Sequence, residues 1–367
     1  MTKTQGKRRI DLGVLYSRSG SYALIARACR TGALKAVEEV NADPTLDIAF
    51  TPVMRDPQGN TDAYAPLCEE ILRTSTARHV IGCVTSWSRK DVIPALERAN
   101  GSLWYSAPYE GFEASDRVVY THACANQHLL PLLDFAYARY GRRVYLTGSN
   151  YIWGWEMNRL AREITAREGG AILGERYLPL GSTEVDRMVE EIRETRPDFV
   201  LNQLIGPSQY VFLDAYAALG REDPYFRPDN CPVMSCNLTE CELPAIGAAA
   251  EGLISAGPWF VGGPKGRFGD GFGSSIEAAT HASVHMLARL LNGRPGAEDW
   301  PLAQLLDLPE AARLGIDPHT HHTAQPALIA QVQGGAFQVL RREDPIEGDP
   351  YLTRGRDTRA HKLRVVQ

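Results

Sequence analysis

The sequence lacks any apolar run long enough to cross a membrane, and no apolar segment of signal-peptide length follows the basic residues near its start. It also has no cysteine among its first residues to which a lipid anchor could be attached. These absences argue against a membrane partner, and they predict a cytoplasmic protein.

A large excess of charge of one sign is also missing. Lys and Arg number 39 against 44 Asp and Glu, which gives a formal net charge of −5 at pH 7, and the basic residues are scattered. Because a surface that binds nucleic acid gathers its basic residues on one face, we expect no direct contact with nucleic acid. At 367 residues, of which 44% are hydrophobic, the chain is long enough for two domains with a core each.

The cysteines show neither a disulfide pattern nor a metal pattern. Seven of them form an odd, scattered set, which is typical of reduced thiols. Cys231, Cys236 and Cys241 are five residues apart, with no CxxC pair and no nearby histidine, so they do not predict a zinc site.

Two groups of histidines give a weak metal signal. His281 and His285 lie four residues apart on an expected helix, which suits a metal, but the sequence shows no third ligand for them. The run from His319 to His322 adds a smaller signal of the same kind. We therefore expect no bound metal and interpret the helical pair as a surface or packing feature.

Known catalytic motifs are absent as well. The sequence contains no GxSxG, no HExxH, no Walker loop and no GxGxxG placed between a strand and a helix. We expect neither an enzyme nor a cofactor.

The chain does contain a regular alternation of strand-like and helix-like segments. The first series predicts strands at Ile10–Tyr16, Ile48–Met54, Val80–Val84 and Leu103–Tyr105, and helices at Tyr22–Asn41, Thr61–Ser75 (with Thr61 as its cap) and Arg89–Ala99. The second predicts helices at His128–Tyr140, Trp155–Glu168, Thr183–Thr195 and Ser208–Leu219, and strands at Arg143–Thr147, Ala171–Pro179, Phe199–Gln203 and Val233–Cys236. Such an alternation predicts parallel sheets with helices on both faces.

Beyond Gly252 the pattern loosens. It predicts a strand at Leu253–Pro258 that returns across the linker, a helix at Ile276–Leu291, and a hairpin formed by Ile329–Gln333 and Phe337–Leu340. We therefore expect an α/β protein with two doubly wound parallel-sheet lobes, joined by a multi-strand hinge with crossings near 121–125 and 250–260, and a cleft between the lobes. The N-terminal lobe would comprise residues 8–124 and 253–328, the C-terminal lobe residues 125–252 and 329–352, and a tail residues 353–367.

The stretch from His79 to Glu113 indicates a ligand site. Two apolar runs within it each end in a small polar or aromatic cluster. Because ligands bind beyond the carboxyl ends of parallel strands, the two clusters should line one cleft. They supply hydroxyls, an indole and a phenol but no charge, and they consist of Thr85, Ser86 and Trp87 after the first run and Tyr105, Ser106 and Ala107 after the second.

Short matches to one known family extend over nearly the whole chain. They comprise Ile81-Gly82-Cys83, Ser86, Arg89-Lys90, Pro94, Glu97-Arg98-Ala99, Tyr105, Pro108–Glu113, Asn126-Gln127, Gly148-Ser149, Tyr151-Ile152 and Asp349-Pro350-Tyr351. The string Pro-Tyr-Glu-Gly-Phe-Glu at 108–113 is the most specific of them. On these residues the sequence resembles the type I periplasmic binding proteins of the branched-chain amino acid receptor branch, and within it the AmiC-type amide-binding regulators of amidase operons.

The resemblance implies the type I periplasmic-binding-protein fold and a ligand sensor rather than a catalyst. AmiC-type proteins bind a short-chain amide in the interlobe cleft and hold an RNA-binding antiterminator inactive until the inducer arrives. The expected partners are therefore a small neutral amide and an antiterminator-type protein, and a homo-oligomer is expected because family members assemble. Related proteins with signal peptides serve as solute-binding receptors of ABC importers for amides, urea or amino acids, and this role is the alternative.

The matching positions also imply the residues of the site. A neutral amide needs a few oriented hydroxyls or main-chain groups and an apolar wall, whereas an amino acid needs paired groups for two charges. The implied polar contacts are Ser86, Tyr105 and Tyr151, and the implied walls are Val84, Trp87, Ala107, Pro108 and Trp153.

Some positions depart from the family pattern. Val84, Thr85 and Ala107 stand where the family has a tyrosine, a methionine and a threonine, and Trp153 replaces a second tyrosine. The smaller side chains enlarge the site and remove donors, and the two tryptophans offer flat surfaces. We therefore expect a bulkier or more aromatic amide, or a related neutral compound.

Each of these residues also has a purely structural interpretation. Ser86 would act as the N-cap of the helix that follows it. Tyr105 and Tyr151 would be half-buried packing residues, and the two tryptophans would pack in the core or at its rim. The string 108–113 would shape the turn after a strand.

Overall fold

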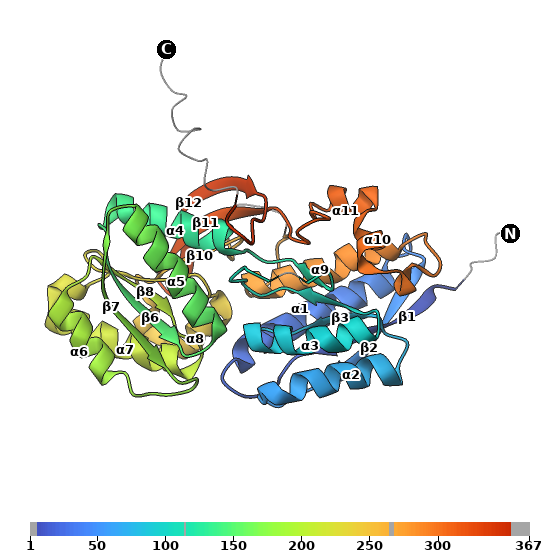
Figure 1. Ribbon diagram of the computed structural model, residues 1–367, viewed down its shortest axis with the longest axis horizontal. Coiled ribbons are helices and arrows are strands. Elements are labelled where there is room, and N and C mark those ends of the chain that lie inside the picture. Colours follow the sequence, from blue (N-terminus) through green and yellow to red (C-terminus); the bar gives the residue numbers. More distant parts are fainter. Residues whose placement is uncertain (1–5, 114, 264–267, 354–367) are drawn as a thin grey trace, which may run out of the picture.

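The structure is a computed structural model that describes residues 6–113, 115–263 and 268–353. The tail expected at 353–367 lies, apart from its first residue, outside the described residues. Two lobes lie side by side along the longest axis, each built on one sheet (Figure 1). No helix in the described ranges has both the length and the apolar character to span a bilayer.

The first sheet has the strand order β2-β1-β3-β4-β5, and its strands are parallel. The inner strands β3 and β4 have only four residues each and are fully buried, which explains why they appear in the sequence as continuous apolar runs. The three-residue β5 was not predicted, because so short a strand carries no periodic signal. The strands are β1 (Arg8–Leu15), β2 (Ile48–Arg55), β3 (His79–Gly82), β4 (Ser102–Tyr105) and β5 (Val118–Tyr120).

Helices cover both faces of this sheet (Figure 1). α1 (Ala23–Ala42) packs against α9 (Ser275–Leu291), and α2 (Tyr64–Thr74) packs against α3 (Ser86–Arg98). A 3-10 turn at Thr61–Ala63 precedes α2, and Asn60 rather than Thr61 caps it, because the Asn60 side chain accepts a hydrogen bond from the Asp62 N–H. The short helices α10 (Leu302–Leu306) and α11 (Pro309–Arg313) complete this lobe.

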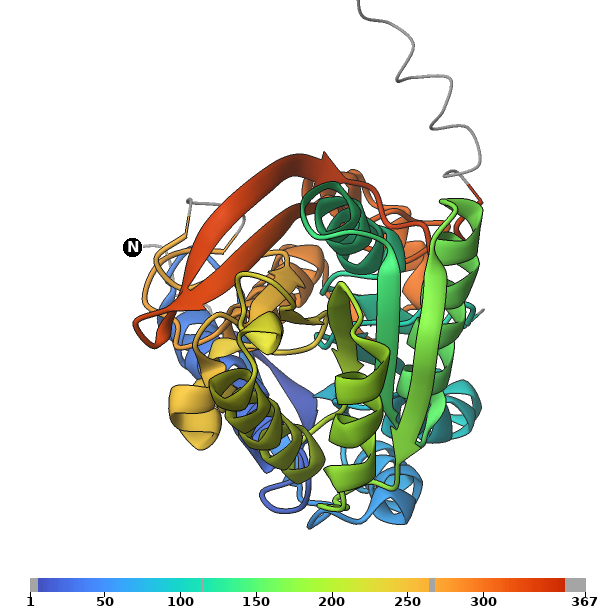
Figure 2. The ribbon, with the colours of Figure 1, turned by 90° about the vertical axis from the view of Figure 1, so that its left-hand side faces the viewer.

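The second sheet has the order β12-β11-β10-β9-β8-β6-β7 and is parallel except for the hairpin at its edge. That hairpin, longer than predicted, spans one side of the lobe (Figure 2). The strands of the second sheet are β6 (Arg143–Ser149), β7 (Ala171–Leu178), β8 (Phe199–Gln203), β9 (Val233–Ser235), β10 (Ile254–Gly257), β11 (Gln325–Gln333) and β12 (Ala336–Ile346). The helices of this second lobe are α4 (Ala125–Arg139), α5 (Ile152–Arg167), α6 (Asp186–Thr195), α7 (Pro207–Glu222) and α8 (Leu243–Ile246).

The expectation of an α/β fold with two lobes is confirmed, but the two lobe boundaries at 253 and 329 do not match the strand pairing. β10 pairs with β9 and β11, so it belongs to the second sheet and does not return to the first lobe. β11 begins in the same sheet at Gln325. Edge pairing depends on contacts between residues far apart in the chain, which local periodicity does not show. The rest of the expected domain division stays a prediction.

Two of the connections between the lobes run side by side. Tyr120 and His322 form a parallel bridge, in which the Tyr120 N–H donates to the His321 carbonyl at 2.9 Å and the Thr323 N–H donates to the Tyr120 carbonyl at 3.1 Å. The Gln325 side chain donates to the Thr121 carbonyl at 2.9 Å. These bonds tie two segments of the hinge to each other just beyond the first sheet.

A glycine sets the distance between α1 and α9. Gly32 lies on the buried face of α1, and a Cβ atom at this position would stand 2.2 Å from the Glu277 carbonyl oxygen of α9. Because backbone rather than a flexible side chain lies opposite, the helices would have to separate to admit even one methyl group.

Gly32→Ala should therefore destabilise the protein, although alanine favours helices more than glycine does. Overpacking a tight contact costs about 1–3 kcal/mol, and this should appear as a lower free energy of unfolding in urea. The exposed neighbour supplies the control, since Thr31→Ala should stay within about 0.5 kcal/mol of the parent protein. If Gly32→Ala were as stable as the parent, the close approach of the two helices would be wrong.

Candidate ligand-binding site between the lobes

A cavity of about 30 Å³ lies between the lobes and is lined by residues from both. Eight of the nine site residues expected from the sequence line it. The ninth, Trp87, packs against Tyr151 with ring centroids 5.8 Å apart. Their roles as ligand contacts stay predictions. The lining residues are Tyr22, Ile25, Val84, Thr85, Ser86, Tyr105, Ala107, Pro108, Tyr151, Trp153, Ile205, Asn237 and Ile276.

The first lobe reaches the cavity through the turn between β3 and α3. Cys83, directly after β3, has a positive φ of 64°, which is uncommon for a residue other than glycine, and this turn leads directly into α3. Thr85 is the N-cap of α3: its Oγ1 accepts from the Ser88 N–H at 3.2 Å, and the Ser88 hydroxyl approaches the Thr85 N–H at 3.3 Å. Ser86 is thus the first residue of the helix rather than its cap, and it lines the cavity.

The second lobe presents the start of α5. Tyr151 is the N-cap residue of α5, and Trp153 follows two residues later. Both side chains are buried, and the indole N–H of Trp153 donates to Gln203 Oε1 at 3.1 Å. Two helices from opposite lobes therefore begin at the cavity. Their first N–H groups create a positive potential that favours a carbonyl or carboxylate oxygen.

None of the described residues that line the cavity carries a charge. Burial raises the pKa of Tyr105, which the nearby Arg89 offsets only in part, and burial raises the pKa of Tyr151 well above its usual value. Both phenols therefore stay protonated at neutral pH and can donate hydrogen bonds. An ammonium group would find no carboxylate among these lining residues.

Five lining residues were missed by the sequence analysis. Tyr22 and Ile25 come from the start of α1, and Ile276 comes from the start of α9. Ile205 and Asn237 follow β8 and β9, so the rule that placed the residues after β3 and β4 would also have found them. The apolar members Ile25, Ile205 and Ile276 line the cavity together with Val84 and Ala107, and the expected enlargement of the site stays a prediction.

A contact between the lobes shows how closely they approach. A Cβ atom on Gly206, which precedes α7 in the second lobe, would stand 2.1 Å from the Ser21 carbonyl oxygen in the first lobe. Gly206 has a positive φ of 58°. With lobes in backbone contact and a cavity of about 30 Å³, the structure represents a closed form.

A buried ion cluster contacts the ring of Tyr105, and its charged residues are not among those that line the cavity. Arg89 is fully buried, and its Nη2 donates to Glu110 Oε1 at 2.6 Å while its Nε donates to Glu113 Oε1 at 3.0 Å. Lys90 Nζ lies 2.8 Å from the other oxygen of Glu113. Burial alone would raise the pKa of Glu113, but Arg89 and Lys90 outweigh it, and the pKa falls to about 2.

Aromatic rings enclose this cluster. The Arg89 guanidinium carbon lies 4.9 Å from the ring centroid of Tyr105, 4.7 Å from that of Tyr109 and 6.0 Å from that of Tyr120. His322 from the hinge stacks on Tyr120 at 4.3 Å, and burial lowers the pKa of His322 to about 4, so this ring is neutral at pH 7.

The string 108–113 has a structural role here. It supplies both glutamates of the ion cluster, and its turn passes close to the end of the described chain: Gly111 has a positive φ of 96°, and a Cβ there would meet the Pro350 carbonyl oxygen at 2.5 Å. The Phe112 N–H donates to this same oxygen, and the Tyr351 hydroxyl donates to the Glu113 carbonyl. Only Pro108 of the string lines the cavity.

Comparison with known proteins points to binding proteins. Residues 10–267 match the family model described as periplasmic binding protein domain. A solute-binding protein of an ABC transporter from R. palustris, in complex with 4-hydroxybenzoate, has a TM-score of 0.78 at 20% identity, over 94% of this chain and 99% of that chain. The branched-chain amino acid transporter substrate-binding protein LivJ from Streptococcus pneumoniae, in complex with isoleucine, has a TM-score of 0.72 at 17% identity, over 93% and 100%. The leucine-binding protein LivK from Thermotoga maritima has a TM-score of 0.74 at 12% identity, over 92% and 99%.

Replacing Arg89 should destabilise the protein strongly. Arg89→Met would leave two buried carboxylates without their main partner, and breaking a buried ion pair costs about 3–5 kcal/mol. Arg98 on the same helix gives the matched control, because its ion pair with Glu69 is exposed (side chains 62% and 57% accessible) and Arg98→Met should cost at most about 1 kcal/mol. Urea unfolding at pH 7 measures both, and similar losses in the two variants would contradict the assigned role of Arg89.

Proposed function

The chain belongs to the periplasmic binding protein family, and on this premise we propose that it binds a small neutral ligand between its lobes and acts as the solute receptor of an ABC-type importer. Binding rather than catalysis agrees with the family and with the similar structures, which are solute- or substrate-binding proteins. The receptor role is supported by the function that those structures' descriptions give, and the ligand class follows from the cavity.

The uncharged lining of the cavity is the observation that carries the ligand class. An amino acid brings an ammonium and a carboxylate, and burying the ammonium without a counter-charge is costly. A neutral amide or urea brings one carbonyl oxygen and NH donors. The carbonyl suits the N-termini of α3 and α5 and the donors Ser86, Tyr105 and Tyr151, and the NH groups suit the oxygens of Ser86 and Asn237.

Ligand entry requires the lobes to separate, because a cavity of about 30 Å³ has room for no more than a few water molecules. A ligand that contacts both lobes binds the closed form better than the open form and so shifts the population towards closure. Ser86 and Tyr105 on one side and Tyr151 on the other are placed to make such contacts.

A cytoplasmic amide sensor that controls an antiterminator-type partner is the second candidate. The match of Arg89-Lys90 and of the string 108–113 to the amide-binding regulators favours it, since these residues build the ion cluster behind the cavity. Both candidates share the ligand class and differ in location and partner. Cell fractionation with an antibody separates them: the sensor should be found in the cytoplasm with a partner that ligand releases, and the receptor outside it.

The ligand class is tested by a thermal-shift screen of amides, ureas, aromatic carboxylates and amino acids, followed by calorimetry. We expect neutral amides or ureas to raise the melting temperature, because they bind the folded form alone. Ser86→Ala should weaken the best ligand about tenfold, the effect of one hydrogen bond of about 1.4 kcal/mol.

Thr31→Ala removes an exposed hydroxyl on α1 and should leave the affinity unchanged. A melting shift produced by amino acids alone, or an unaltered affinity in Ser86→Ala, would contradict the proposed ligand class. A melting shift with aromatic carboxylates alone would agree with binding at the helix N-termini, but it would show that the ligand is an aromatic carboxylate and not an amide.

A further inference from the structure

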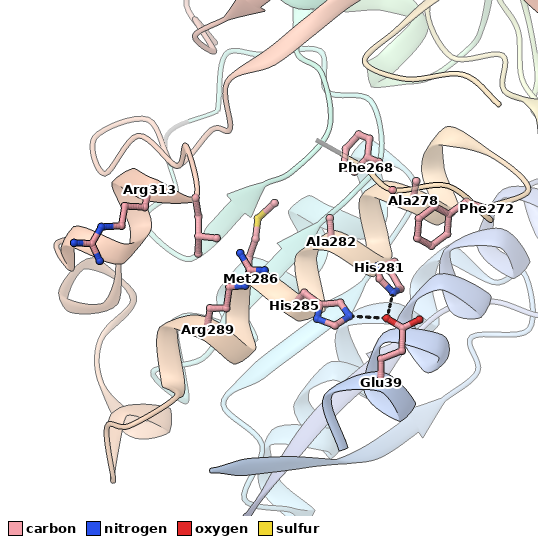
Figure 3. A pocket seen from close by; sticks show the side chains of 12 residues that line it. Glu39, Phe268, Phe272, Ala278, His281, Ala282, His285, Met286, Arg289 and Arg313 are labelled. Atoms are coloured by element: carbon pink, nitrogen blue, oxygen red, sulfur yellow. Dashed lines mark hydrogen bonds and ion pairs between the residues drawn. The ribbon is translucent and has the colours of Figure 1, made fainter. Parts of the chain in front are cut away.

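A second cluster of polar side chains lies between α1 and α9, outside the set of residues that lines the interlobe cavity. Glu39 from α1 faces His281 and His285 from α9 (Figure 3). Glu39 Oε2 lies 2.7 Å from His281 Nε2 and 3.0 Å from His285 Nε2. Both imidazoles thus contact the same carboxylate oxygen, whereas one imidazole would be enough to form a hydrogen bond with it.

The packing of the two helices positions this cluster. The contact of Gly32 with the Glu277 carbonyl brings the backbones together, and Glu39 follows Gly32 by seven residues, which is two helical turns. His281 and His285 follow Glu277 by one and two turns on the same face of α9. The ring centroids of the two histidines are 4.5 Å apart.

We propose that Glu39, His281 and His285 bind a divalent transition metal ion of the zinc type. Two imidazole nitrogens and one carboxylate oxygen are the protein ligands of open zinc sites, and histidines four residues apart on a helix suit one ion. The three ligand atoms already lie within 4.8 Å of one another. Zinc bonds of about 2.0–2.2 Å place tetrahedral ligands roughly 3.3–3.5 Å apart. Glu39 Oε2, at 2.7 and 3.0 Å from the two nitrogens, would therefore move outward to admit the ion.

A cavity of about 420 Å³ adjoins the cluster and leaves room for a fourth ligand such as water. Phe268, Phe272 and Met286 form its apolar walls, and Arg289 and Arg313 also line it (Figure 3). Lys35 lies over the Phe272 ring at 4.4 Å and donates to the Gly271 carbonyl. These three cations oppose a bound cation, so the ion should exchange with chelators rather than be held permanently.

The test is titration calorimetry of Zn²⁺ into the untagged, chelator-stripped full chain. The expected result is one equivalent of zinc per chain at this site and a zinc-dependent rise in melting temperature. His281→Gln, His285→Gln and Glu39→Gln should each weaken binding by on the order of ten- to a hundredfold and reduce that rise. His319→Gln, in the other histidine run of the sequence, should bind as the parent does.

Melting curves without zinc show whether each variant folds. Because three single variants are made, the test can still be carried out if one of them does not fold. The proposal is overturned if no equivalent of zinc binds, if binding survives unchanged in both His285→Gln and Glu39→Gln, or if only His319→Gln removes it. None of the three ligands lines the interlobe cavity, so a failure here leaves the proposed amide or urea binding standing, and the reverse also holds.

Discussion

The buried ion cluster around Arg89 is the interaction on which the rest of the structure depends. A fully buried guanidinium is tolerated only with close counter-charges, and here two carboxylates of the string 108–113 supply them. The same cluster joins three parts of the chain: the start of α3, the end of β5 through the Tyr120 hydroxyl, and the end of the described chain through the Tyr351 hydroxyl. Its geometry therefore fixes the first turn of α3, which forms one wall of the cavity.

This arrangement explains how a site beside so many charges remains uncharged. The charge of Arg89, whose guanidinium lies over the Tyr105 ring, is balanced by Glu110 and Glu113. The described residues that line the cavity contribute only protonated phenols, hydroxyls, an indole, an amide and apolar groups. The polarity of the site then comes from the N-termini of α3 and α5, which begin at the same point from opposite lobes. A ligand that bridges these two helix ends would hold the lobes together, and the backbone contact between Gly206 and Ser21 shows how far closure proceeds.

Much of this was predictable from the sequence, because parallel strands and helices have different periods and because ligands gather at the carboxyl ends of strands. That rule brought Ser86, Tyr105 and Ala107 to one place. It did not show that Tyr22, Ile25 and Ile276 fill the same space, since these residues come from helices that meet only in the folded chain. The pairing of β10 with β11 and the approach of Glu39 to histidines more than two hundred positions away escaped local patterns for the same reason. The spacing of His281 and His285 was visible in the sequence, but Glu39 could not be recognised there as a third ligand.

Small-angle X-ray scattering with and without a saturating ligand tests the central claim, that a small neutral molecule closes the two lobes. The ligand would be the amide or urea that raises the melting temperature most. The account predicts a larger radius of gyration for the free protein and, with ligand, a scattering curve that matches this closed structure. Identical curves in the two conditions, at a ligand concentration shown by calorimetry to saturate the protein, would contradict it.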